Sequence, residues 1–353
     1  MNIHEILKIK INKKMNSLLI MINLIKYYYN IFFLLSLLLL FNKSTSLISF
    51  KYPSSISLLN HNFFIVEEKG IYVYDKDFKY IVKSYLLAAD EQINSLDQLS
   101  EVIIKYQNEY LICLINSKIY FFDKTGTKLL ITEKVILDDI YYHPTLAPIF
   151  NKSGYYYFVI GYFILDSGKY KLKLLYYKIN LTDYSYSNFH THIDDDFESF
   201  YWFTYKFKNK GLSCDYMVDD DNYDDYYLLC FFIIEGDDGD ELAESFYIMD
   251  ESEIKWTGAY NLDYIITDDI KNTIQIKTVT TSNLRNILVA LLLSTNKINY
   301  YKYYYKSVNT KFYESSTANF DCRNTLYSMK LNYLSNNNYI VLSCINSYST
   351  VQA

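Results

Sequence analysis

Three side chains near the middle of the chain have the types and spacing of a metal site. His190, His192 and Asp194 occupy alternate positions. Alternate residues of a β-strand point to one face, so both imidazoles and the carboxylate would lie together. These groups are zinc ligands, but the sequence offers no further ligand at a recognisable spacing. The alternative is a polar strand end beside an acidic run, and we therefore assign no metal and no cofactor.

Two acidic stretches, residues 219–225 and 235–241, offer the oxygen ligands that Ca²⁺ prefers. Neither follows the spacing of an EF-hand loop, so solvated turns are the favoured interpretation. Residues 123–127 read Asp-Lys-Thr-Gly-Thr, a fragment of a sialidase Asp-box without its Ser and Trp. A β-turn closed by glycine explains this fragment better. The chain has no phosphate-binding loop, zinc-protease motif or serine-hydrolase elbow, and we name no catalytic residue.

Residues 298–305 interleave tyrosine with lysine, a pattern that can stack nucleic-acid bases. The net charge of the chain is −6, whereas a nucleic-acid binder needs a basic surface to displace phosphate counterions. We interpret the ladder as a surface strand and expect no nucleic-acid partner.

Four of the five cysteines form two local pairs. Cys214 and Cys230 are 16 residues apart, and Cys322 and Cys344 are 22 apart. Each pair brackets a polar turn between two apolar runs, as in adjacent antiparallel strands, which bring side chains close to disulfide geometry. Each bond would stabilise the fold by roughly 3 kcal/mol. The alternative is that all four are small buried core residues. Cys113 has no local partner.

The N-terminus has the features of a secretory leader, which we place at residues 1–46. Five lysines between positions 8 and 26 precede an 11-residue apolar run at positions 31–41, and small residues follow. The alternative is an uncleaved signal anchor, because residues 17–41 are long enough to span a bilayer. Both place the following residues outside the cytosol, in a secreted or cell-surface protein. Membrane association is expected only through this segment.

Glycosylation sequons agree with that compartment. Asn151 and Asn180 each begin an Asn-x-Ser/Thr sequence, and a third sequon, at Asn42, would leave with the leader. We predict glycans on Asn151 and Asn180.

The composition predicts an all-β fold. The chain of 353 residues is 50% hydrophobic and 18% aromatic, with 41 Tyr and 22 Phe, which favour strands. No amphipathic helix of ten or more residues is evident. Residues 86–100 are the best helix candidate, although a loop explains them equally well.

A strand–turn–strand unit recurs along the chain. Residues 71–76 (Ile-Tyr-Val-Tyr-Asp-Lys) return 48 positions later as residues 119–124 (Ile-Tyr-Phe-Phe-Asp-Lys). Further copies place positions 178, 250 and 302 as equivalents of 75 and 123. We attribute the 72-residue gap between 178 and 250 to insertions. A repeat of about 50 residues indicates a propeller or a repeat array.

Residues 69–75 and 117–123 resemble the inner strands of irregular β-propeller blades, such as quinoprotein-like and WD40-like blades. The Gly-His and Trp-Asp signatures of WD40 repeats are missing, and so is the quinoprotein Trp motif, since Trp202 and Trp256 are the only tryptophans. The resemblance implies an architecture and no function. A propeller must close its ring. We therefore expect either that the sequence is truncated or that the ring closes with residues 47–66.

These patterns predict an ectodomain at residues 47–353, a β-propeller-like array of antiparallel strands that is incomplete at its C-terminus if the sequence is truncated. Loops on a rigid β scaffold are where binding usually resides. The leading hypothesis is a secreted or surface-exposed binding or adhesion domain for a protein or glycan ligand. One alternative is an extracytoplasmic propeller hydrolase with two facing carboxylates roughly 5–9 Å apart. The other is an intracellular repeat scaffold.

Overall fold

The computed structural model describes most of the region after residue 54, in part by its backbone alone. The described residues are 55–59, 62–75, 81–93, 102–107, 110–123, 126, 128–135, 137–138, 141–194, 197–198, 204–218, 226–236, 239–261, 270–281, 286–294, 298–304, 311–318, 326–334, 339–346 and 351–352. The predicted leader at residues 1–46 lies outside them, so it stays a prediction, as does the boundary at residue 47. Within the described part of the chain there is no helix with the length and hydrophobicity of a membrane span.

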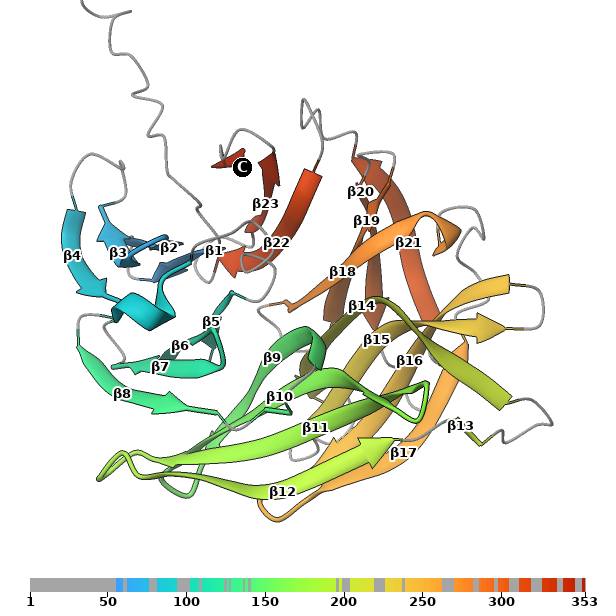
Figure 1. Ribbon diagram of the computed structural model, residues 1–353, viewed down its shortest axis with the longest axis horizontal. Coiled ribbons are helices and arrows are strands. Elements are labelled where there is room, and N and C mark those ends of the chain that lie inside the picture. The colour runs from blue at the N-terminus through green and yellow to red at the C-terminus, as the bar shows by residue number, and fades with distance from the viewer. Residues whose placement is uncertain are drawn as a thin grey trace, which may run out of the picture. The chain divides into compact units, whose positions relative to one another are not determined.

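The described strands form six antiparallel sheets, in each of which consecutive strands pair in chain order (Figure 1). The first sheet consists of β1 (Ser55–Leu59), β2 (Asn62–Glu67), β3 (Gly70–Tyr74) and β4 (Ile81–Leu86). The second consists of β5 (Ile103–Gln107), β6 (Tyr110–Ile115), β7 (Lys118–Phe122) and β8 (Leu129–Lys134). The third consists of β9 (Tyr141–Lys152), β10 (Tyr155–Asp166), β11 (Lys169–Asn180) and β12 (Tyr186–Asp194).

The remaining sheets follow the same plan. The fourth consists of β13 (Phe197–Glu198), β14 (Thr204–Val218), β15 (Tyr226–Gly236), β16 (Gly239–Met249) and β17 (Ile254–Asn261). The fifth consists of β18 (Thr273–Thr280), β19 (Asn286–Leu293), β20 (Ile298–Tyr304) and β21 (Lys311–Ala318). The sixth consists of β22 (Leu326–Leu334), β23 (Tyr339–Asn346) and β24 (Val351–Gln352).

One strand of each sheet contacts its counterparts in the neighbouring sheets. We call these six strands the ring strands; they are β1, β5, β9, β14, β18 and β22. Each contacts the next in this order, and β22 contacts β1. The sheets therefore form a closed ring, which makes the fold a β-propeller. The ring closes through residues 55–59, inside the segment expected for closure.

The repeat found in the sequence corresponds to strands further from the ring centre. Residues 71–76 and 119–124 fall on β3 and β7, which are the third strands of their sheets. We expected these residues to form the inner strands of their blades, but they lie two strands away from the ring strand of each sheet. Four of the five residues of β3 and of β7 are buried, which agrees with their nearly continuous apolar pattern.

Burial follows strand position. All six residues of β6 are buried, because second strands are covered by a sheet on each face. In the outer strand β4, five of six residues are exposed. The buried side chains form four clusters, one between each pair of consecutive sheets from the first to the fifth. The apolar strands are thus buried on both faces, which explains their nearly continuous hydrophobic runs.

Two further expectations change. The 72-residue gap contains lengthened strands, since β14, β15 and β16 have 15, 11 and 11 residues, whereas β5, β6 and β7 have 5, 6 and 5. The gap also contains β13, an additional strand that makes the fourth sheet five-stranded, so the expected insertions and the longer strands both contribute to it. In the helix candidate at 86–100, the described residues contain one 3-10 turn at Ala89–Glu91, and residues 94–100 lie outside the description.

Candidate functional site at the centre of the ring

Lys105 crosses the middle of the ring. Its Nζ donates to Asp215 Oδ2 at 2.9 Å and to the carbonyl oxygen of Thr278 at 2.9 Å. Lys105 belongs to β5, whereas Asp215 and Thr278 belong to β14 and β18, two and three steps further around the ring. The side chains of Lys105 and Asp215 are 11% and 1% exposed, so this ion pair is buried. One lysine therefore ties three ring strands together.

Polar contacts between β14 and β18 hold Asp215 in place. Ser213 Oγ and Thr278 Oγ1 lie 2.9 Å apart, and the Thr278 amide donates to Ser213 Oγ at 3.0 Å. The Tyr216 amide donates to Asp215 Oδ1 at 3.0 Å. Gly211 allows this approach of the strands, because a Cβ there would lie 3.0 Å from the Ile276 nitrogen and its φ is +141°. Both carboxylate oxygens of Asp215 are therefore engaged.

The charges of two further basic residues interact with this region. Burial, and then the charge of Lys105, lower the pKa of Lys277 on β18 to about 8. Burial, and then the charge of Lys277, also lower the pKa of His143 on β9, although hydrogen bonds to Asn209 oppose this shift. His143 adopts a left-handed backbone conformation with φ 52°. Both shifts favour the uncharged forms of these two groups.

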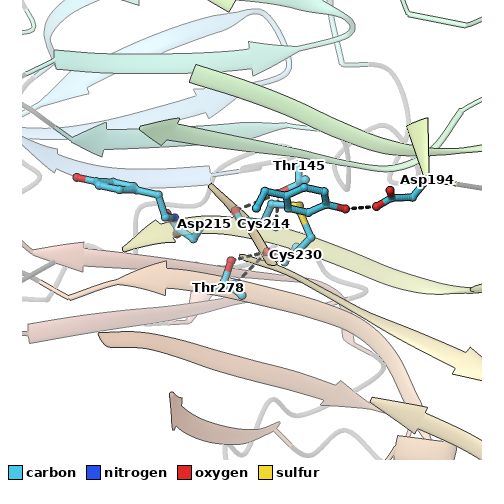
Figure 2. Close-up of a disulfide and its surroundings, with 9 residues drawn as sticks. Thr145, Asp194, Cys214, Asp215, Cys230 and Thr278 are labelled. Carbon is cyan, nitrogen blue, oxygen red and sulfur yellow. Dashed lines mark hydrogen bonds between the residues drawn. A yellow bond between two sulfur atoms is a disulfide. The ribbon is translucent and has the colours of Figure 1, made fainter. Parts of the chain in front are cut away.

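The predicted cysteine pair of the fourth sheet lies beside this cluster (Figure 2). Cys214 and Cys230 are directly opposite each other in β14 and β15, and their sulfur atoms are at disulfide-bonding distance, 2.06 Å. Both are fully buried, and the Cys214 amide donates to Thr145 Oγ1 on β9 at 3.0 Å. The disulfide therefore joins β14, the ring strand of the fourth sheet, to β15, the next strand of the same sheet.

The other cysteines differ. Cys322 lies outside the described residues, and Cys344 lies opposite Met329 in the backbone register of β23. Their bond stays a prediction. Cys113 on β6 is a free, fully buried thiol, and burial raises its pKa. It packs opposite Ile104 and Tyr120.

Two of the three residues that suggested a metal, His192 and Asp194, form a hydrogen-bonded set with Tyr247, whereas His190 lies opposite Tyr176 in the register of β11 and β12. His192 Nε2 lies 2.7 Å from Asp194 Oδ1, and the buried Tyr247 hydroxyl donates to Asp194 Oδ2 (Figure 2). Among the described residues, no group of three His, Cys, Asp or Glu side chains is arranged to hold a metal. No local sequence pattern pointed to Tyr247, because it lies 53 residues from Asp194. These hydrogen bonds join β12, the outer strand of the third sheet, to β16 of the fourth sheet.

The acidic motifs form turns and ion pairs where they are described. Residues 219–225 lie outside the description. Glu235 pairs with Lys208 at 3.3 Å, and Asp240 pairs with Lys208 at 3.9 Å and with Lys210. These carboxylates join the β15–β16 hairpin to β14. At the Asp-box fragment, the Gly126 amide donates to the Asp123 carbonyl at 2.9 Å, which is the expected turn.

The tyrosine–lysine ladder is not a surface strand. It corresponds to β20, which lies between β19 and β21, and Ile298 and Tyr301 are buried. The surface interpretation was therefore wrong for Ile298, Asn299 and Tyr301, whereas the side chains of residues 300 and 302–305 lie outside the description.

Both sequons of the ectodomain lie at one end of the third sheet. Asn151 is exposed near the end of β9, and Asn180 ends β11. The Leu181 amide donates to the Gly154 carbonyl at 2.9 Å, so the two turns that follow these asparagines touch. The β10–β11 turn, at Ser167 and Gly168, lies at the opposite end of the same strands.

Comparisons with known proteins show likeness of fold only. No protein-family model and no curated protein matches the chain. The N-terminal domain of Nup159 is 10% identical, with 85% of this chain and 74% of that chain covered and a TM-score of 0.41. The β-propeller domain of Vanderwaltozyma polyspora Nup133 is 10% identical (85% and 92% covered, TM-score 0.40), and Drosophila semaphorin 1a extracellular domains 1-2 are 8% identical (85% and 84%, 0.39). The propeller assignment rests on the strand order and the ring strands.

Proposed function

We propose that this chain is a secreted or cell-surface binding domain that recognises a protein ligand through the end of the propeller opposite to Asn151 and Asn180. The observation that carries this proposal is the clustering of both sequons at one end of one sheet. Glycans there would cover that end and leave the other end open. The leader and the bonded position of Cys214 and Cys230 support an oxidising compartment.

The ring centre supports binding in preference to hydrolysis. A propeller hydrolase would need a carboxylate that is able to exchange a proton with its substrate. Asp215, the described carboxylate at the centre, is buried and engaged by Lys105 and the Tyr216 amide. This carboxylate therefore acts as part of the scaffold.

Among the described residues, the end opposite to the sequons includes two tight turns. Asn116 and Ser117 connect β6 to β7, and Ser167 and Gly168 connect β10 to β11, with positive φ at all four residues. Such two-residue turns are rigid and match the twist of their strands. Rigid loops lose little conformational entropy when a partner binds, which suits a protein ligand.

The compartment is tested by expressing the full chain in eukaryotic secretory cells. We expect secreted protein whose mass falls on glycosidase treatment, with one glycan lost in Asn151→Gln and one in Asn180→Gln. Protein that stays in the cytosol without glycosidase-sensitive mass would contradict the proposal.

The binding end is tested with an engineered glycan. The double substitution Ser167→Asn and Lys169→Thr creates a sequon in the exposed β10–β11 turn, where Asn tolerates the positive φ. We expect this variant to lose binding of the labelled protein to intact cells of its source organism. The matched control, Asn151→Gln with Asn180→Gln, should bind as the wild type does; loss in the control alone would place the ligand at the sequon end.

A further inference from the structure

The outer strand of the first sheet, β4, exposes apolar side chains to solvent. Ile81 is 53% exposed, Val82 56% and Leu86 77%. The described part of the chain has six exposed large hydrophobic residues, and the other three lie on three different strands. A concentration of exposed apolar side chains on a folded protein marks an interaction surface. β4 is therefore a candidate interface.

The free edge of β4 can hydrogen-bond to another strand. β4 pairs with β3 on one side, and among the described strands none pairs with its other side (Figure 1). A strand at the edge of a sheet presents a row of amide and carbonyl groups to which an extended strand can be added. The exposed apolar side chains and the free edge thus occur on the same strand.

β8 and β12, the other outer strands whose side chains are all described, carry protection against such pairing. β8 exposes one threonine and two charged residues, Glu133 and Lys134. β12 exposes three polar residues and a single apolar one, Ile193. Charged and polar residues on an edge strand keep sheets from joining edge to edge. β4 has one charged residue, Lys83, so this protection is weakest there.

We propose that two copies of this chain pair through the free edges of their β4 strands, antiparallel and about a two-fold axis at Ser84. The first sheets of both copies would then form one continuous sheet, which closes the free edge of each. This interface goes beyond the proposed function and does not depend on it, because the sequons and the β10–β11 turn belong to the third sheet.

Strand geometry limits the registers in which β4 can pair with itself. Lys83 and Tyr85 lie opposite Val73 and Ile71 of β3, so they share one face of the sheet, and Ser84 lies on the other face. Two strands related by a two-fold axis present the same face on the same side, and residues directly opposite each other share a face. Each residue of β4 can therefore lie opposite itself or opposite a residue an even number of positions away.

The register centred on Ser84 pairs compatible side chains. It places Val82 opposite Leu86 of the second copy, and both are exposed apolar residues. It also places Lys83 opposite Tyr85, and an ammonium group over an aromatic ring is favourable. Within one copy, the Lys83 Nζ already lies 5.0 Å from the centroid of the Tyr85 ring. Centring on Lys83 would oppose two like charges, and centring on Tyr85 would place Val82 opposite position 88, beyond the end of β4.

The proposed contact is short. β3 has no residue opposite Val82, because the register of the two strands shifts there. Regular pairing of the two copies therefore extends over residues 82–86, which is at the small end of protein interfaces. We expect a dimer that dissociates on dilution through the micromolar range.

The experiment measures the mass of the purified full chain by analytical ultracentrifugation, from nanomolar to high micromolar concentration. We expect a monomer at the low end and a dimer at the high end. Leu86→Lys should weaken the dimer at least about tenfold, because it removes an apolar contact and adds a charge to the edge. The matched control is Ile193→Lys, at an exposed apolar residue of the outer strand β12, which should dimerise within about twofold of the wild type.

Three outcomes of this measurement would overturn the proposal. The first is a wild type that stays monomeric at the highest concentration. The second is equal weakening of the dimer by Leu86→Lys and Ile193→Lys, or no weakening by either. The third is a wild type that binds a different protein through β4 in place of a second copy.

Engineered cysteines test the register without relying on a loss of binding. Ser84→Cys should form a disulfide-linked dimer under oxidising conditions, because residue 84 lies opposite its own copy at the axis. Lys83→Cys should not, since residue 83 lies opposite Tyr85. Thr132→Cys, at an exposed residue of β8, is the control, and non-reducing electrophoresis with peptide mass spectrometry identifies the bond. Linkage through Lys83→Cys but not Ser84→Cys, or equal linkage of Ser84→Cys and Thr132→Cys, would contradict the pairing.

Discussion

The β5–β6 pair and the β14–β15 pair make the same local arrangement with different outcomes. In each, a buried cysteine of the second strand lies opposite a residue of the ring strand: Cys113 opposite Ile104, and Cys230 opposite Cys214. In each, the next ring-strand residue is charged. It is Lys105 in one pair and Asp215 in the other, and these two side chains bind each other.

The difference shows how little separates a covalent tie from a packed core. Ile104 and Cys113 share one apolar cluster, and Cys214 and Cys230 share another. One residue on the ring strand decides whether the cysteine is bonded or free. Lys105 and Asp215 join the two regions through the ring centre. Each region therefore stabilises the other, although their sheets, the second and the fourth, are not adjacent in the ring.

The largest effect is expected from breaking the central ion pair. Asp215→Leu should lower the free energy of unfolding by about 3–5 kcal/mol, because it leaves Lys105 buried without a counterion. Adding Lys105→Met to this variant should restore most of the loss. Denaturant unfolding gives the measurement. If Asp215→Leu has no larger effect than Lys171→Met, which removes the exposed Lys171–Asp166 pair, the two regions are not coupled through the centre.

The next effect separates the bonded cysteine from the free one. Cys230→Ala should lower the free energy of unfolding by about 3 kcal/mol, because the bond closes a loop of 16 residues. Cys113→Ala should lower it by about 1 kcal/mol, the effect of a small truncation in a core. Unfolding is compared with and without reductant, and only the wild type and Cys113→Ala should respond to it. If reductant does not change the unfolding of the wild type, the Cys214–Cys230 disulfide does not stabilise the fold and the prediction is wrong.

A third substitution should convert the first region into the second. Ile104→Cys places a thiol directly opposite Cys113, on the same face of β5. The connection of β5 to β6 puts this pair three positions from the hairpin turn, at a site where cross-strand side chains lie close together. We expect a disulfide under oxidising conditions, with a net gain of at most about 1 kcal/mol, since the lost Ile burial offsets the loop closure. Thiol titration and non-reducing mass check it, with Ile104→Ser as the control.

The smallest effect concerns acid stability of the second sheet. Burial raises the pKa of Glu91, but hydrogen bonds from Lys118 and Tyr120 outweigh it, and the pKa is lowered overall. Its contribution is present above the ordinary Glu pKa and is lost as the pH falls through the folded value. Glu91→Gln should therefore flatten this part of the stability–pH curve and leave the curve at neutral pH parallel to that of the wild type. An unchanged slope would show that Glu91 does not tie the 3-10 turn to β7.

The sequence predicted features that depend on near neighbours. Strands and turns followed from alternating aromatic and β-branched runs, and Cys214 and Cys230 fell opposite each other because a hairpin places residues of nearby sequence in register. The ring strands were harder to recognise. They are polar where they line the centre, so β5 and β14 lacked the repeat that identified β3 and β7. His192 and Asp194 were singled out together with His190, but their partner Tyr247 was not.

By itself, the sequence determined an all-β chain of repeated sheets and the opposition of one pair of cysteines, since these depend on side-chain periodicity and local hairpins. Only the tertiary structure decided which residues meet at the centre. Lys105 and Asp215 are 110 residues apart, and nothing in their local sequence distinguishes them from other charged residues. They meet because ring closure places β5 across from β14 and β18, where burial makes a single charge pair count for far more than it would on the surface.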